Sequence, residues 1–319
     1  MGETSIKNPI PFAHRGNTAA APENTAAAFD SAVALGCCVE MDIRRTADGE
    51  LVVFHDPDLR RVALGTPAGE DTRPVEALRW QELQRIRLPY AGHLLQYFPP
   101  QGFEREEWYY YPWALDNPQT ILARAAGQQN ENPADAMTRL IESYRAEYMR
   151  AFDADPRTAP LMSLREFLRW VRRQPAWFCA EIEYKGLGLN DGVYTLLEET
   201  GTADRCILMS GVPAINTEMQ AFAAKNGKPA GLRFGANIRY ANEEQLASIR
   251  EWDLYEVGLN AGTFDAQTVA GLMDIGIRVF SNLGDTPVWW QAMQRNGVAA
   301  FKTNCPQRYL EWLRQKQTE

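Results

Sequence analysis

From about residue 160 to the C-terminus, this sequence alternates short apolar runs with longer amphipathic runs. The apolar runs predict buried strands that end near Tyr184, Met209, Phe234, Asn260, Ser281 and Thr303. Segments with helical spacing precede them, over Ser163–Gln174, Asp191–Thr200, Ala214–Asn226, Asn242–Trp252, Ala266–Ile275 and Val288–Asn296. With two more strands at Ile10–Gly16 and Val39–Arg44, the pattern favours an α/β fold, the (β/α)8 TIM barrel. A doubly wound sheet is the alternative, but no G-x-G-x-x-G motif follows the first strand.

The stretch from Pro11 to Asp56 holds two of the three histidines of the chain. Its first strand is short, apolar and closed by glycine, so His14 and Arg15 stand where the strand opens into a loop. The following Pro-Glu-Asn-Thr predicts a helix start, with Asn24 or Thr25 as the N-cap. This stretch therefore carries polar residues to the C-terminal end of the first strand.

The second strand is predicted over Cys37 to Ile43, and its period of two places Glu40 and Asp42 on one face. Two acids that point into a sheet or barrel need a cation. A turn and a short strand over Leu51–Phe54 then bring His55-Asp56 to the end of that strand.

Five short motifs combine in this region. They are His14-Arg15-Gly16, Pro22-Glu23-Asn24-Thr25, Glu40-x-Asp42, Thr46-x-Asp48-Gly49 and Val52-Val53-x-His55-Asp56. In order and spacing they resemble the glycerophosphodiester phosphodiesterase family, densely over residues 10 to 56 and more thinly from about residue 160. The resemblance implies a barrel enzyme that hydrolyses glycerophosphodiesters to sn-glycerol 3-phosphate and an alcohol. A glycerol hydroxyl would attack the phosphate, and water would open the cyclic phosphate that results.

The third barrel strand reads Trp177 to Lys185, and its period places Glu181, Glu183 and Lys185 on one face. The family pattern here is Glu-x-Lys, which Glu183-x-Lys185 fits, so the resemblance implies Glu183 as the third metal ligand beside Glu40 and Asp42. Glu181 is the competing choice. Such an oxygen-only site suits one divalent cation, Ca²⁺ or Mg²⁺, better than Zn²⁺.

Proton transfer at neutral pH suits two histidines, and His14 and His55 are predicted at the ends of neighbouring strands as general acid and base. Arg15 and Lys185 are expected to bind the substrate phosphate. One alternative is a phospholipase D-like enzyme that acts on lysophospholipid or sphingolipid. Another is a non-catalytic phosphate-ester binding protein, although pure binding does not require two proton-transfer groups.

Between His55 and Leu161 the alternation of strands and helices fails. We expect one catalytic barrel domain over residues 1–319, with an inserted subdomain after the second strand at about residues 62–160. The insertion carries the aromatic run Trp108–Trp113, which could cover the barrel mouth or form a small core of its own. His93 also lies there and is expected at the surface.

Net charge and composition limit the classes of molecule that this chain is expected to bind. A net charge of −8 disfavours nucleic acid, and no basic stretch suggests stable membrane association, so the expected partner is a small-molecule substrate. The polar N-terminus lacks the apolar core of a signal peptide, which favours the cytoplasm. Five cysteines without C-x-x-C spacing indicate core thiols. The sequence leaves the oligomeric state open.

Two late motifs depart from the family pattern. Phe280-Ser281 replaces the usual Trp-Thr, and Thr303-Asn304-Cys305-Pro306 replaces Thr-Asp-x-Pro. The run Leu59–Ala63 also replaces Leu-x-Arg-Thr-Thr. These changes leave the expected metal and acid–base groups intact, so they bear on the identity of the leaving alcohol.

Overall fold

The computed structural model describes residues 8–60, 62–63, 66–90, 150, 153, 157–239, 241, 246–247, 249–260, 263–285 and 287–316. Several sequence predictions concern residues beyond these ranges, among them most of the insertion predicted at about residues 62–160. His93 and the aromatic run Trp108–Trp113 lie outside the described residues, as does much of the helix predicted over Asn242–Trp252.

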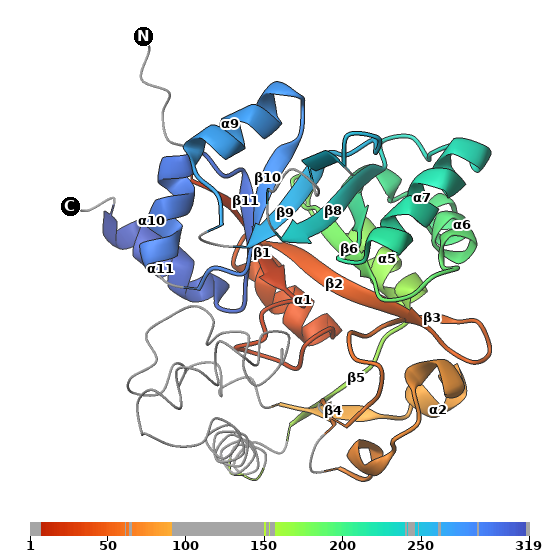
Figure 1. Ribbon diagram of the computed structural model, residues 1–319. Helices are drawn as coiled ribbons and strands as arrows, with labels where there is room; N and C mark the ends of the chain where they lie inside the picture. The colour runs from red at the N-terminus through yellow and green to blue at the C-terminus, as the bar shows by residue number, and fades with distance from the viewer. Residues whose placement is uncertain are drawn as a thin grey trace, which may run out of the picture.

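Parallel strands close into a barrel in the described part of the chain (Figure 1). They are β1 (Ile10–His14), β2 (Cys38–Arg45), β6 (Ala180–Tyr184), β7 (Cys206–Met209), β8 (Arg233–Arg239), β9 (Glu256–Asn260), β10 (Arg278–Asn282) and β11 (Ala300–Thr303). Their order is β1-β11-β10-β9-β8-β7-β6-β2, and the pairing of β2 with β1 closes the ring. The predicted (β/α)8 TIM barrel is therefore confirmed.

Helices surround the barrel on its outside (Figure 1). They are α1 (Ala26–Ala34), α5 (Leu164–Arg172), α6 (Asn190–Thr200), α7 (Pro213–Asn226), α9 (Ala266–Asp274), α10 (Pro287–Asn296) and α11 (Pro306–Lys316). A 3-10 turn, η5 (Ala203–Arg205), precedes β7. Thr25 is the N-cap of α1, because its hydroxyl accepts the N–H of Ala28. The sequence reading did not predict α11, whose Tyr309 and Trp312 are buried.

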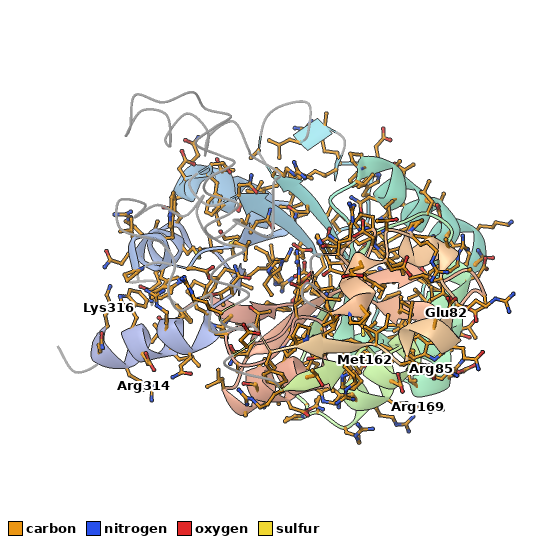
Figure 2. All side chains as sticks on the ribbon, turned by 90° about the horizontal axis from the view of Figure 1, so that it is seen from below. Glu82, Arg85, Met162, Arg169, Arg314 and Lys316 are labelled. Atoms are coloured by element: carbon orange, nitrogen blue, oxygen red, sulfur yellow. The ribbon has the colours of Figure 1, made fainter. Side chains whose placement is uncertain are left out.

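The helices bury one apolar face against the barrel and leave charged side chains outside. Phe29 of α1 packs on Phe167 and Trp170 of α5, with ring centroids 5.0 and 5.5 Å away. Figure 2 shows Arg169 on α5 and Arg314 on α11 at the outer surface, where both are exposed. Among the described residues, no helix combines the length and apolarity needed to span a membrane.

The N-terminal ends of the strands enclose an apolar floor inside the barrel. Its buried members are Phe12, Cys38, Ile207, Phe280 and Ala300. Phe280 packs on Phe12, with ring centroids 5.3 Å apart. Because this end is filled with apolar side chains, the polar interior of the barrel lies toward the C-terminal ends of the strands.

After β2 the chain leaves the barrel pattern. The short strand β3 (Leu51–Val53) runs antiparallel to the end of β2. The chain continues through η1 (Pro67–Glu70), η2 (Val75–Ala77), α2 (Trp80–Leu83), β4 (Arg87–Pro89) and β5 (Thr158–Pro160). Strands β4 and β5 pair antiparallel, and a separate apolar cluster that includes Leu59 and Leu88 lies beneath this segment.

Strand β8 runs five residues beyond its predicted end near Phe234, and reaches Arg239 after an irregularity in register next to Asn237. Glycine in the interior of a strand usually weakens it. Inside the barrel, however, the side chain of Glu256 fills the space above Gly235. A Cβ atom at Gly235 would lie only 1.6 Å from Glu256 Oε1, so the strand needs glycine there.

Candidate active site at the C-terminal ends of the strands

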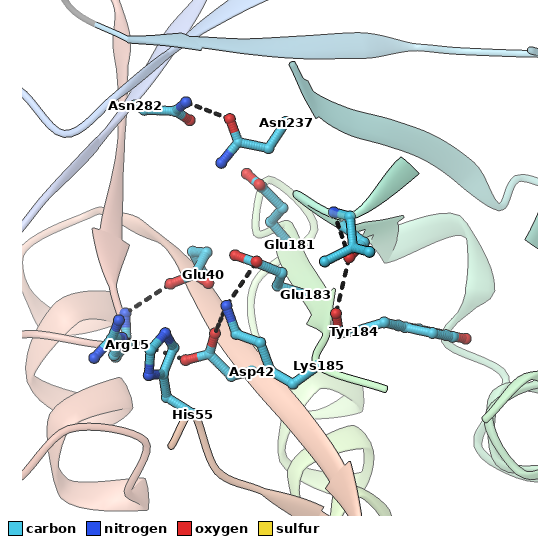
Figure 3. Close-up of polar contacts among 12 residues, drawn as sticks. Arg15, Glu40, Asp42, His55, Glu181, Glu183, Tyr184, Lys185, Asn237 and Asn282 are labelled. Carbon is cyan, nitrogen blue, oxygen red and sulfur yellow. Dashed lines mark hydrogen bonds and ion pairs between the residues drawn. The ribbon is translucent and has the colours of Figure 1, made fainter. Parts of the chain in front are cut away.

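Three carboxylates converge inside the barrel from two adjacent strands. Glu40 and Asp42 of β2 are fully buried, and the parallel register sets Asp42 beside Glu183 of β6. One carboxylate oxygen from each of the three lies within 4.8 Å of the others. Figure 3 shows these side chains pointing toward one another from β2 and β6. We call Glu40, Asp42 and Glu183 the acid cluster.

Basic side chains border the acid cluster. Lys185 Nζ lies 2.6 Å from Glu183 Oε1 and 3.1 Å from Asp42 Oδ1. Arg15 Nε lies 3.3 Å from Asp42 Oδ2, and the backbone N–H of Arg15 donates to Glu40 Oε2 over 3.0 Å. Arg15 and Lys185 therefore reach the same acid cluster from positions directly after β1 and β6.

The loop before α1 also contributes to the site. Asn24, whose φ of 56° is left-handed, donates from Nδ2 to Asp42 Oδ2 over 2.9 Å. Asparagine adopts this backbone region more readily than most residues. Glu23 Oε1 lies 3.0 Å from Arg15 Nη1. Sequence reasoning considered Asn24 only as a helix cap, although an Asn in a loop after the first strand was a usable signal.

Both histidines have an oxygen partner at Nδ1. His14 Nδ1 lies 2.8 Å from Asn304 Oδ1, and His55 Nδ1 lies 2.5 Å from Asp56 Oδ1. His14 Nε2 lies 3.9 Å from Glu40 Oε2. Burial, followed by the charge of Arg15, lowers the pKa of each histidine. At neutral pH both rings are therefore neutral, with a proton on one nitrogen only.

The strands that carry the two histidines are not neighbours, contrary to the sequence prediction. His14 ends β1, whereas His55 follows β3, and each of these strands pairs with β2. The sequence pattern did not reveal this arrangement, because β3 pairs antiparallel with the end of β2 and is not one of the barrel strands. The two rings still border one site, since Asp42 affects the pKa of both.

The acid cluster has unequal carboxyl groups. Burial raises the pKa of Glu40 well above its usual range, and Asp42 and Glu183 raise it further. Burial also raises the pKa of Asp42, but the surrounding positive charge, led by Lys185, outweighs it and holds that pKa well below its usual range. Glu40 Oε1 has no hydrogen-bond partner among the described residues. This arrangement of buried oxygen atoms fits a divalent cation.

A second polar layer lies one pleat deeper. Glu181 of β6 is fully buried and its Oε1 lies 2.6 Å from Lys302 Nζ of β11. Figure 3 shows Glu181 apart from the acid cluster, beneath the paired amides of Asn237 and Asn282. Glu181 is thus engaged by a lysine that lies more than a hundred residues away in the sequence. Glu183 is the member of this pair that joins the acid cluster.

Glu256 of β9 belongs to the same deeper layer and was not singled out by sequence reasoning. It is fully buried, and neither carboxylate oxygen has a hydrogen-bond partner in the described part of the chain. Burial raises the pKa of Glu256 well above its usual range, and the nearby Glu181 adds to the shift. The buried environment of Glu256 therefore favours the protonated form of its carboxyl group in the folded protein.

Comparison with known proteins places this site in a family context. The profile described as the glycerophosphoryl diester phosphodiesterase family matches residues 14–307. A probable glycerophosphodiester phosphodiesterase 1 of Mycobacterium tuberculosis is 49% identical over 64 residues, 20% of this chain and 23% of that protein. A glycerophosphodiester phosphodiesterase of Caldanaerobacter subterraneus is 48% identical over 55 residues, 17% of this chain and 23% of that protein. The matched segments thus span about a quarter of these curated relatives.

Solved structures extend the likeness of fold to nearly the whole chain. A putative glycerophosphodiester phosphodiesterase from Galdieria sulphuraria superimposes with a TM-score of 0.67 at 14% identity, over 97% of this chain and 99% of the other. A phosphodiesterase from Oleispira antarctica, in complex with its product sn-glycerol-3-phosphate, gives a TM-score of 0.64 at 17% identity over 96% of both chains.

The raised pKa of Glu256 predicts a pH dependence of stability. Because the folded pKa is raised, the stabilisation is complete below the unfolded pKa of about 4.3 and falls as pH rises toward the folded pKa, by up to about 1.4 kcal/mol per pH unit. Glu256→Gln, which is neutral throughout, should gain stability relative to the native protein as pH rises. Urea unfolding between about pH 5.5 and 8.5 measures the difference. The exposed Glu251→Gln controls for the lost charge. Parallel pH profiles would show that Glu256 is ionised in the folded protein.

Proposed function

Because this chain belongs to the glycerophosphoryl diester phosphodiesterase family, a family of phosphoric diester hydrolases, we propose that it hydrolyses glycerophosphodiesters to sn-glycerol 3-phosphate and an alcohol. One observation carries the proposal. The acid cluster, two neutral histidines and two basic side chains meet at the C-terminal ends of the strands, where barrel enzymes bind their substrates.

Glu40, Asp42 and Glu183 would hold one divalent cation, Ca²⁺ or Mg²⁺. Once bound, the cation would withdraw charge from the phosphodiester oxygens. Lys185 and Arg15 already balance part of the charge of the acid cluster, and both would bind phosphate oxygens of the substrate as well. The buried oxygen of Glu40 that lacks a partner supports this assignment.

His14 and His55 would exchange protons with the substrate through Nε2, because Nδ1 of each ring is held by an oxygen. One histidine takes the proton of a glycerol hydroxyl, whose oxygen then attacks phosphorus. The other gives a proton to the leaving alcohol, and the two exchange roles when water opens the cyclic phosphate. The product would link the enzyme to glycerol and lipid metabolism, and the sn-glycerol-3-phosphate complex of the Oleispira antarctica protein supports that substrate class.

The reaction is tested by the release of sn-glycerol 3-phosphate from glycerophosphodiesters of choline, ethanolamine, inositol and glycerol, in Ca²⁺, in Mg²⁺ and in EDTA. We expect release from at least one diester that stops in EDTA and returns with one of the cations. Lysophosphatidylcholine is included because cleavage of that lipid alone would favour a phospholipase D-like activity. Silence on every substrate, with the cation still bound, would favour a binding protein.

The metal assignment is tested by a matched pair of substitutions on one strand. Glu183→Gln should weaken cation binding by more than about tenfold, whereas Glu181→Gln should change it by less than about threefold, because Lys302 engages Glu181. Isothermal titration calorimetry with Ca²⁺ and Mg²⁺ measures both. The reverse order would assign the third ligand to Glu181.

The acid–base assignment is tested at the two histidines. His14→Ala and His55→Ala should each lower kcat by about 10²- to 10⁴-fold while the affinity for the cation stays within about threefold, because neither ring is assigned to the metal. Kinetics and calorimetry on the same preparations separate the two effects. Loss of cation binding in either variant would move that histidine into the metal site.

A further inference from the structure

A buried carboxylate outside the acid cluster stands two hydrogen bonds away from His14. Asp285, which follows β10, is fully buried. Its Oδ2 accepts the side-chain amide Nδ2–H of Asn304 over 3.0 Å, and its Oδ1 accepts the backbone N–H of Asn304 over 3.0 Å. The hydroxyl of Thr303 also donates to Oδ1. Asp285, Asn304 and His14 therefore form one chain of hydrogen bonds, which we call the relay.

The chemistry of the relay fixes the direction of each bond. Burial raises the pKa of Asp285, while the hydrogen bonds donated by Thr303 and Asn304 act in the opposite direction and favour the carboxylate. A carboxylate only accepts hydrogen bonds, so the Asn304 amide turns its NH₂ group toward Asp285. Its Oδ1 then faces His14 Nδ1, 2.8 Å away. Because an amide oxygen only accepts, His14 must carry its proton on Nδ1. A neutral imidazole has one such proton, so Nε2 is left with its lone pair.

We propose that Asp285 and Asn304 are positioning residues that hold the His14 proton on Nδ1 and thereby present Nε2 to the substrate. The inference rests on the proposed function only for its effect on turnover, since the position of the proton is a property of the protein alone. Neither residue touches the acid cluster in the hydrogen bonds of the described chain. Their effect on turnover is therefore exerted through His14.

The substitution Asp285→Asn should reverse the relay. The backbone N–H of Asn304 cannot turn, so the new amide must keep its oxygen at the Oδ1 position and place its NH₂ group at the Oδ2 position. That group now faces the NH₂ of Asn304, which has to flip. The flipped Asn304 donates to His14 Nδ1, and the ring proton moves to Nε2.

A double exchange, Asp285→Asn with Asn304→Asp, should restore the original state. The carboxylate at position 304 accepts both from the new amide and from His14 Nδ1–H, while the backbone N–H of residue 304 keeps its acceptor. Composition and net charge are the same as in the native protein. If Asp285 served stability alone, the double exchange would not be expected to return the His14 proton to Nδ1.

The test is nitrogen-15 NMR of the full chain with labelled histidine, in which only three histidines contribute signals and His14→Gln assigns those of His14. We expect the proton on Nδ1 in the native protein, on Nε2 in Asp285→Asn, and on Nδ1 again in the double exchange. In parallel, kcat should fall by about 10²- to 10⁴-fold in Asp285→Asn with KM changed by less than about threefold, and return to within about tenfold in the double exchange.

Three results would overturn the relay: a native His14 proton on Nε2, an inactive Asp285→Asn variant with an unchanged proton position, or a folded double exchange that does not restore Nδ1–H. Should Asp285→Asn fail to fold, Asn304→Ala removes the acceptor and should give a mixture of the two proton positions; an unchanged His14 would contradict the proposal. If the proton positions follow the expectation while the native protein hydrolyses none of the diesters, the relay stands and the proposed function fails.

Discussion

The closed barrel buries more carboxyl groups in its interior than the basic side chains around them can pair one to one. Alternation along the strands turns five carboxyl groups inward, and the basic side chains that meet them in the described chain are Arg15, Lys185 and Lys302. Burying a charge is costly unless it is paired. The buried carboxyl groups are accommodated in different ways. Glu181 is paired with a lysine and the pKa of Glu256 is raised, which favours its neutral form, while the acid cluster gathers its carboxylates toward the C-terminal ends of the strands.

Much of this arrangement was predictable because it depends on local spacing. A period of two was enough to place Glu40 beside Asp42 on one strand face, and the repeated strand and helix pattern was enough to predict the barrel. What sequence alone could not supply depends on register between distant strands. The pairing of Glu181 with Lys302 and the contact of His14 with Asn304 join residues that are far apart in the chain. Asp285 gave no signal, since a single Asp after a strand is usually a turn residue.

The two late departures from the family motifs occupy different places in the structure. Phe280 lies in the apolar floor against Phe12, where its ring fills space and has no polar partner to satisfy. Asn304 lies at the opposite end of the strand layer and contacts a histidine of the site. The sequence reading connected both changes to the leaving alcohol. That prediction stays untested, and the geometry adds that Phe280 packs in the apolar floor and that Asn304 contacts His14.

The antiparallel pairing of β4 with β5 has a consequence for how this molecule can vary. Arg87 is paired with Pro160 in a two-stranded sheet separate from the barrel, so two points that are far apart in the sequence lie side by side. The entropy lost on closing a loop grows only slowly with its length. The number of residues between these two anchor points can therefore change without altering the distances that the barrel must satisfy. Segments of different length could therefore be exchanged between β4 and β5, by evolution or by design, while the barrel stays the same.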